Sequence, residues 1–274
     1  MAIQKGIIQL SGKLVDLIFY QRKNKTVVRR VKKDGTLYKR SEGSIQSGKD
    51  FGETSKNARY IRKAFAPLVE KYADDDIVNR LNIKLIDVFK TIPIENRGSK
   101  KLVDGDISLL KGFEFNRHTC LDRLYYSPPM VTIKPDGKLS LRLTEGEMDS
   151  LFAKNKKFPN VCLNLMVFGF DLNGDDYEIF RVNELRLPLD EVFAGGNITD
   201  LQTNQTGERV LLIALGVHYS NGSSRSHDRK KYACQIINAF HLKDGVIVPF
   251  VAASIEEKPK KDDEEDTGLD WEIG

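Results

Sequence analysis

The sequence predicts an α+β fold in which an N-terminal β-hairpin and a pair of helices precede an antiparallel, β-sandwich-like body. Three observations predict it. β-Rich runs lie near the N-terminus, apolar residues recur at three- and four-residue steps from residue 54, and short strand-like runs separated by turn residues fill the chain after residue 112. We therefore divide the chain into residues 1–117, residues 118–255 and an acidic tail at residues 256–274.

The first predicted element is the β-hairpin. Residues 14–20 and 26–31 are rich in β-branched and aromatic side chains, and they flank a polar turn at residues 21–25. Residues 40–49 are rich in glycine and serine. That composition predicts a mobile loop between the hairpin and the first helix.

Two helices are predicted next. The first begins near Thr54, and its apolar stripe consists of Tyr60, Ile61, Ala64, Phe65, Leu68, Val69 and Tyr72. Pro67 is expected to kink or split this helix, because proline lacks the N–H that a helix needs. Aspartates at residues 74–76 favour a second helix start, and Pro93 ends that helix. Its apolar face consists of Ile77, Leu81, Leu85, Val88 and Phe89. We expect the two helices to pack as an antiparallel pair.

Turn residues divide the rest of the chain into strands. A Pro-Asp-Gly turn at residues 135–137 and an Asn-Gly turn within residues 171–176 each separate two strand-like runs. The predicted strands are residues 131–134, 138–143, 161–170, 177–187, 210–219, 232–240 and 246–251. Short strands at this spacing are typical of a sandwich or barrel rather than a parallel sheet.

Composition narrows the class of protein. No apolar stretch approaches the roughly 20 residues that a membrane-spanning helix needs. The three cysteines, Cys120, Cys162 and Cys234, are odd in number and far apart, which argues against a disulfide framework and fits a reducing compartment. We expect a protein of the cytoplasm, or of a virion if the chain is phage-encoded, with no membrane partner.

Two stretches imitate ligand-binding loops. Residues 43–49 have the glycine and lysine spacing of a phosphate-binding loop, but Asp50 replaces the serine or threonine that binds Mg²⁺, so we interpret the stretch as a flexible loop. Residues 171–176 resemble a calcium loop whose glycine comes too early and whose final glutamate position is Val182. We interpret them as a hairpin turn.

Catalytic and metal motifs are sparse. His118 and Cys120 could begin a metal site, but no Cys-x-x-Cys or His-x-x-x-His pair completes one. A nucleophilic Cys–His pair stays open as an alternative, because its partners meet in space rather than in sequence. We predict no metal, no cofactor and no enzymatic activity.

Charge is distributed unevenly. Residues 1–63 hold 16 lysines and arginines against 5 acidic residues, and residues 256–274 hold 9 acidic residues against 3 lysines. The basic block is interleaved with Phe19, Tyr20 and Tyr38. It is either a nucleic-acid-binding surface, through phosphate attraction and base stacking, or a solvated hairpin edge. The candidate binding residues are Arg22, Lys23, Lys25, Arg29, Arg30, Lys32 and Lys33.

The acidic tail ends in three large apolar residues, Leu269, Trp271 and Ile273. We expect the tail to be disordered in isolation. It is then a partner-docking peptide, a cover for the protein's own basic surface, or a solubilising tail.

The N-terminal part also carries a resemblance. The residues that carry it are 6–14, 16–20, 28–30, 51–56, 97–98, 103–105 and 110–116, with a weaker echo at 212–217. With its Gly-Ile-Ile-x-Leu-Ser-Gly-Lys opening, this pattern resembles that of a family of uncharacterised Bacteroidetes proteins, whose members typically have glycine where this chain has Val15. The resemblance implies a bacterial origin and a shared N-terminal module. It implies no catalytic residue, because the family has no established activity.

These observations favour a non-enzymatic binding or assembly protein, such as a structural component of a phage or mobile element. The partner would be a second copy of the chain or another protein. The alternative is a nucleic-acid-binding protein, with single strands as a candidate ligand, whose acidic tail docks a partner.

Overall fold

The computed structural model describes residues 2–3, 10–22, 25–30, 40–69, 72, 74–134, 138–171, 177–202, 206–222 and 224–252. The chain divides into two compact units, Met1–Ile45 and Gln46–Gly274. The predicted turns at residues 135–137 and most of 171–176 lie outside the described residues.

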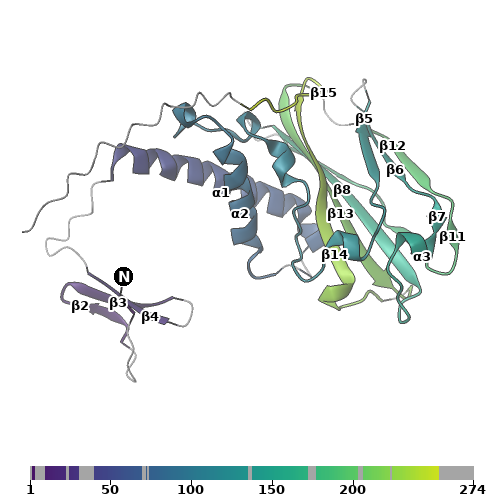
Figure 1. Cartoon of the computed structure of the whole chain (residues 1–274), viewed down its shortest axis with the longest axis horizontal. Coiled ribbons are helices and arrows are strands. Elements are labelled where there is room, and N and C mark those ends of the chain that lie inside the picture. Colours follow the sequence, from purple (N-terminus) through teal and green to yellow (C-terminus); the bar gives the residue numbers. More distant parts are fainter. Residues whose placement is uncertain are drawn as a thin grey trace, which may run out of the picture. The chain divides into compact units, whose positions relative to one another are not determined.

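The N-terminal unit holds a four-stranded antiparallel sheet (Figure 1). Its strand order is β1-β4-β3-β2, with bounds Ala2–Ile3 (β1), Gly12–Leu14 (β2), Leu17–Arg22 (β3) and Lys25–Arg30 (β4). The predicted hairpin is confirmed as β3 and β4, whose register sets Phe19 opposite Val28 and Tyr20 opposite Val27. The turn is shorter than predicted, because Arg22 and Lys25 are already paired. β2 is a separate strand that the sequence did not reveal.

The turn between β2 and β3 contains an unusual backbone conformation. Val15 has φ +51°, in the left-handed region, and its side chain is 81% exposed. A β-branched residue is strained there, whereas glycine is not. Glycine at position 15 would therefore relieve this strain.

The first helix begins earlier than predicted. α1 spans Glu42–Val69, so the expectation of a mobile loop over residues 40–49 is wrong. Ser41 caps the helix, because its Oγ accepts the N–H of Ser44 at 3.3 Å. Further along, the Asp50 carboxylate accepts the N–H of Gly98 at 2.9 Å. The cap and this tertiary bond stabilise turns whose composition alone favours a loop.

The end of α1 matches the predicted apolar stripe but not the predicted break. α1 continues through Pro67 and ends two residues later, so it is not split. Ile61 and Phe65 are fully buried. The carboxylate of Asp74, just beyond, accepts the N–H of Asp76 at 3.0 Å and an Nη2–H of Arg80.

The second helix, α2, spans Ile77–Lys90 and buries Leu81, Leu85, Val88 and Phe89. It begins where predicted and ends before Pro93. Figure 1 shows α2 running across α1 rather than alongside it, so the expected antiparallel arrangement is wrong. The chain then approaches α2 closely at Gly105, where a Cβ would lie 2.7 Å from the Val88 carbonyl oxygen.

Short 3₁₀ helices connect the helical pair to the body. They are η1 (Ile94–Asn96), η2 (Leu102–Asp104), η3 (Ile107–Leu110) and η4 (Leu121–Arg123). The segment beyond η3 is bonded to the body, since Phe115 donates its N–H to the Cys234 carbonyl at 2.7 Å.

The body is built on one large antiparallel sheet of order β10-β8-β13-β14-β15, with β9 also paired to β8. The strands are β8 (Asn160–Asp171), β9 (Tyr177–Arg181), β10 (Leu185–Pro188), β13 (Glu208–Ser220), β14 (Tyr232–Lys243) and β15 (Val246–Ile247). The predicted hairpins are confirmed in β8–β9 and β13–β14. The single strand expected over residues 177–187 is two strands, and the strand expected over residues 246–251 has only two residues.

A smaller sheet of order β12-β6-β5 faces the large one. Its strands are β5 (Met130–Ile133), β6 (Lys138–Leu143) and β12 (Gly196–Gln202). A separate two-stranded pair consists of β7 (Gly146–Glu147) and β11 (Val192–Phe193). The remaining elements are the short helix α3 (Met148–Leu151) and the 3₁₀ helix η5 (Arg229–Lys231). β5 and β6 were predicted. β12 was missed, because its glycine and asparagine start resembles a loop.

The large sheet is therefore buried on both faces. On β13, Val210, Leu212 and Ala214 join the core beneath the helices. The alternate residues Leu211 and Ile213 join the second core, toward β6. Helices, large sheet and small sheet form successive layers (Figure 1), which confirms the predicted α+β fold with a sheet-rich, sandwich-like body.

None of the helices in the described part of the chain is long and apolar enough to cross a membrane.

The strained turn gives a test. Replacing Val15 with glycine should stabilise the N-terminal sheet by about 1 kcal/mol, because glycine adopts the left-handed conformation without a clash. Hydrogen exchange of the β2 and β3 amides in the full-length protein should slow by up to about fivefold. The matched control is Val192→Gly on β11. Val192 is exposed but does not have a positive φ, so glycine there should speed up the hydrogen exchange of the β11 amides. Faster exchange in Val15→Gly would contradict the assignment of strain to this turn.

Candidate functional site

The N-terminal sheet holds the described part of the predicted basic surface. Lys25, Arg29 and Arg30 lie on β4 with exposed side chains. Arg22 ends β3, and its side chain is not among those described. Lys23, Lys32 and Lys33 lie outside the described residues.

The sheet divides these cations between its two faces. Side chains along a strand alternate between the two faces of the sheet, and residues paired across neighbouring strands lie on the same face. Lys25 and Arg29 therefore share a face with Tyr20 and Ile18. Lys13, opposite Ile18 on β2, joins that face. Arg30 lies on the other face, where its Nε donates to Asp16 Oδ2 at 2.9 Å. The structure thus brings Lys13, Lys25 and Arg29 together and separates Arg30 from them.

The other candidates that the sequence suggested have plain structural roles or lie outside the described residues. The loop-like stretch at residues 43–49 is helical, and Asp50 bonds backbone N–H groups rather than a phosphate. The predicted tail residues Leu269, Trp271 and Ile273 lie outside the described residues. His118 and Cys120 are exposed, and no third ligand joins them among the groups that the described residues form.

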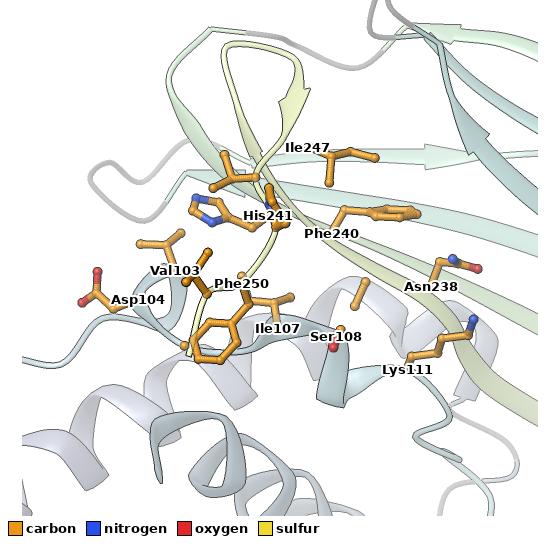
Figure 2. Close-up of a pocket in the computed structure, with 15 residues that line it drawn as sticks. Val103, Asp104, Ile107, Ser108, Lys111, Asn238, Phe240, His241, Ile247 and Phe250 are labelled. Carbon is orange, nitrogen blue, oxygen red and sulfur yellow. The ribbon is translucent and has the colours of Figure 1, made fainter. Parts of the chain in front are cut away.

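A groove lies between the η2–η3 segment and the end of β14 (Figure 2). It has a volume of about 440 Å³, and its walls include Val103, Ile107, Phe240, Ile247 and Phe250. The groove is lined mainly by apolar side chains.

Two polar residues in the groove have partners close by. The Ser108 hydroxyl donates to Asp106 at 2.5 Å, and the His241 ring bonds Glu208 at 3.0 Å. Serine and histidine are therefore not paired as a nucleophile and its base.

A polar cluster lies at one end of the large sheet, on the side of the helices. Cys162 on β8 lies directly opposite His218 on β13, and the same row continues to Arg186 on β10 and Tyr232 on β14. Cross-strand partners project from the same face. Glu184, between β9 and β10, completes the cluster: its carboxylate, the Cys162 sulfur and a His218 nitrogen all lie within 4.8 Å of one another.

This cluster was missed in the sequence because no spacing links its members. Cys162 and His218 are 56 positions apart and meet only through strand register. One signal was present: His218 lies within an otherwise mostly apolar strand, where a polar side chain needs a reason.

Glu184 is held by cations. Its Oε2 accepts from Arg225 Nη2 at 2.7 Å, its Oε1 accepts from Arg186 Nη2 at 3.3 Å, and the Asn164 amide adds a longer contact of 3.4 Å to Oε2. Burial raises the pKa of Glu184, but the charge of Arg225 and the neighbouring hydrogen bonds outweigh it, so the pKa lies below its usual value. Glu184 is therefore ionised at neutral pH.

Cys162 and His218 are both deeply buried. Burial, reinforced by Arg225, lowers the pKa of His218 to about 4. Burial also raises the pKa of the Cys162 thiol. A nucleophilic pair needs a thiolate beside a base that can hold its proton. A neutral thiol beside a weakly basic imidazole does not provide one.

A small pocket leads to the cluster. It has a volume of about 90 Å³ and is lined by Pro67, Leu68, Tyr72, Asn164, His218, Arg225 and Tyr232. Tyr72 and Tyr232 stack with ring centroids 3.9 Å apart, and the Tyr232 hydroxyl donates to the Leu68 carbonyl. Gly216 leaves room for that hydroxyl, since a Cβ there would lie 3.2 Å from it.

A second buried carboxyl lies nearer the middle of β14. Glu114 Oε1 accepts from the Leu121 N–H at 2.8 Å and from Gln235 Nε2 at 2.7 Å, whereas Oε2 is buried without a hydrogen-bond partner among the described residues. Burial raises the pKa of Glu114 to about 7. The carboxyl links η4 to the sheet, and no nucleophile or base contacts it among its described partners.

No protein-family model matches the chain, and neither does any curated protein or solved structure. The resemblance to Bacteroidetes proteins thus stays a prediction.

Glu114 predicts a pH dependence of stability. Its pKa is about 7 in the folded protein against 4.5 in the unfolded chain, so the folded state binds more protons between these values. The contribution of Glu114 to stability should fall as pH rises from about 4.5 to about 7, by on the order of 2 kcal/mol after allowance for solvent screening. Glu114→Gln keeps the accepting oxygen and should lose this dependence.

The measurement is urea unfolding of both proteins at several pH values. The free energy of unfolding of Glu114→Gln should exceed that of the wild type at pH 8 and converge with it near pH 4. An equal pH profile in the two proteins would contradict the assignment. Glu208→Gln, a half-exposed glutamate paired with His241, is the matched control for removing one carboxylate.

Proposed function

We propose that the chain is a non-enzymatic binding or assembly protein whose N-terminal unit, Met1–Ile45, attaches it to a second copy of the chain. The observation that carries the proposal is the half-exposed apolar surface of a single-layer sheet. Leu17, Ile18, Phe19 and Tyr20 on β3 are all only partly buried, and among the described apolar residues of the unit only Val27 is buried. A unit this small that buries so little apolar surface gains stability when a further layer or strand covers it.

The edges of the sheet supply the means of attachment. β1 and β2 are the outer strands, and the residues at the β2 edge include Leu14 and Val15, which are 61% and 81% exposed. An exposed edge strand pairs readily with another strand through its free backbone groups. A second copy offers the same edge, so a two-fold symmetric pairing satisfies both copies at once.

The absence of a catalytic arrangement among the described residues is consistent with this role but does not carry it. A structural component of a phage or mobile element, in the cytoplasm or a virion, stays the more specific prediction.

One observation favours the alternative of nucleic-acid binding. Lys13, Lys25 and Arg29 share a sheet face with the partly buried Tyr20, and cations beside an aromatic ring suit a single strand. In an anisotropy titration with labelled single-stranded DNA at two salt concentrations, Lys25→Glu with Arg29→Glu should abolish binding. Arg30→Glu, on the opposite face, is the matched control and should weaken it far less. Binding that vanishes by physiological salt would count against this alternative.

The assembly proposal is tested by size-exclusion chromatography with light scattering. The wild type should be a dimer or larger at tens of micromolar, and Leu14→Glu with Val15→Glu should weaken association at least about tenfold, because charges at the edge block pairing. The control is Ile94→Glu, which places a charge at an equally exposed apolar position in η1 of the other unit and should leave the oligomer intact.

A wild type that is monomeric throughout this concentration range would overturn the proposal of self-association. Equal loss of the oligomer in Ile94→Glu would place the interface in the body instead.

A further inference from the structure

The cluster at the end of the large sheet contains a buried nitrogen without a partner. The His218 side chain is 2% exposed, and its Nε2 is buried with no hydrogen-bond partner among the described residues. Glu184 Oε2 lies 3.7 Å from this nitrogen, beyond hydrogen-bond distance. A buried polar atom in this state requires an explanation, and a bound ion is one of the few available.

The separation of the two groups fits a metal between them. Zinc bonds to nitrogen and oxygen are about 2.0–2.2 Å long, so two such ligands lie roughly 3.3–3.6 Å apart around a tetrahedral ion. The observed 3.7 Å between His218 Nε2 and Glu184 Oε2 is close to that value. The Cys162 sulfur lies within 4.8 Å of a ring nitrogen of His218 and of a carboxylate oxygen of Glu184.

We propose that Cys162, Glu184 and His218 form a zinc-binding site that joins β8, β13 and the segment before β10. One sulfur, one nitrogen and one oxygen ligand select zinc over magnesium or calcium, which prefer all-oxygen sites. A small pocket that His218 lines lies beside the site, and in zinc sites with three protein ligands water takes the fourth position.

The surrounding groups act as a supporting layer. The Ser220 hydroxyl lies 3.2 Å from the Cys162 sulfur and can donate to a thiolate. The Asn164 amide nitrogen lies 3.4 Å from His218 Nδ1 and 3.4 Å from Glu184 Oε2, so one side chain contacts two of the proposed ligands.

Two arginines beside Glu184 lower the affinity of the proposed site for zinc. Arg186 and Arg225 bond Glu184 and place positive charge near the metal position. The thiolate and the carboxylate together neutralise a divalent zinc ion, and binding releases the thiol proton. The arginines then orient the carboxylate from outside, at some cost to affinity.

The test uses the full-length protein, stripped with a chelator and titrated with zinc in competition with a chromophoric chelator. One zinc ion per chain should bind, and cobalt should give a thiolate-to-metal charge-transfer band. Cys162→Ser should abolish the band and weaken zinc binding at least tenfold, and Glu184→Gln should weaken it similarly. The matched controls are Cys234→Ser, a buried cysteine outside the cluster, and Cys120→Ser, the exposed one; both should bind as the wild type does.

X-ray absorption of the zinc-loaded wild type needs no variant and therefore stays informative if Cys162→Ser fails to fold. It should show one sulfur at about 2.3 Å with two or three nitrogen or oxygen neighbours at about 2.0 Å. No zinc binding by the wild type, unchanged binding in a folded Cys162→Ser, or a shell without sulfur would each overturn the proposal.

Discussion

The structure depends on the burial of β8, β13 and β14 on both faces. From Arg209 to Ser220 every residue of β13 is buried, with alternate side chains entering the core under the helices and the core toward the small sheet. Each large aliphatic side chain that is fully buried contributes about 1.5–3 kcal/mol from the removal of apolar surface from water. The helices and the small sheet are held in place because each covers one face of these three strands.

The same constraint explains where polar chemistry is concentrated. Leu68, near the end of α1, and Tyr72 line the same small pocket as His218. His218 is paired with Cys162 across β13 and β8, so the polar row of the sheet lies beside the end of the helical layer. Polar groups in such a place are costly unless they are bonded. Two arginines bond Glu184, Ser220 contacts the Cys162 sulfur and Asn164 contacts His218 Nδ1. The nitrogen of His218 that is left without a partner among the described residues is the exception from which the zinc proposal starts.

The sequence predicted what local pattern controls and missed what tertiary contact controls. Alternation and turn residues predicted β5, β6, β8 and the β13–β14 hairpin, and periodicity predicted the buried stripe of α1. The first turns of α1 were missed because their glycines and serines favour a loop. The Ser41 cap and the hydrogen bond that the Gly98 N–H donates to Asp50 stabilise the helix there despite this composition. The cluster of Cys162, Glu184 and His218 was not predicted, because strand register rather than sequence spacing brings its residues together.

The central claim is that stability is concentrated in the doubly covered sheet, while the N-terminal sheet depends on a further strand or layer for its own. Native-state hydrogen exchange of the full-length protein, diluted until it is monomeric, tests it most directly. We predict that the amides of β13 exchange only through global unfolding and that those of β3 and β4 exchange at least about a hundredfold faster, a difference of ~3 kcal/mol. Equal protection of β3 and β13 in the monomer would contradict the account.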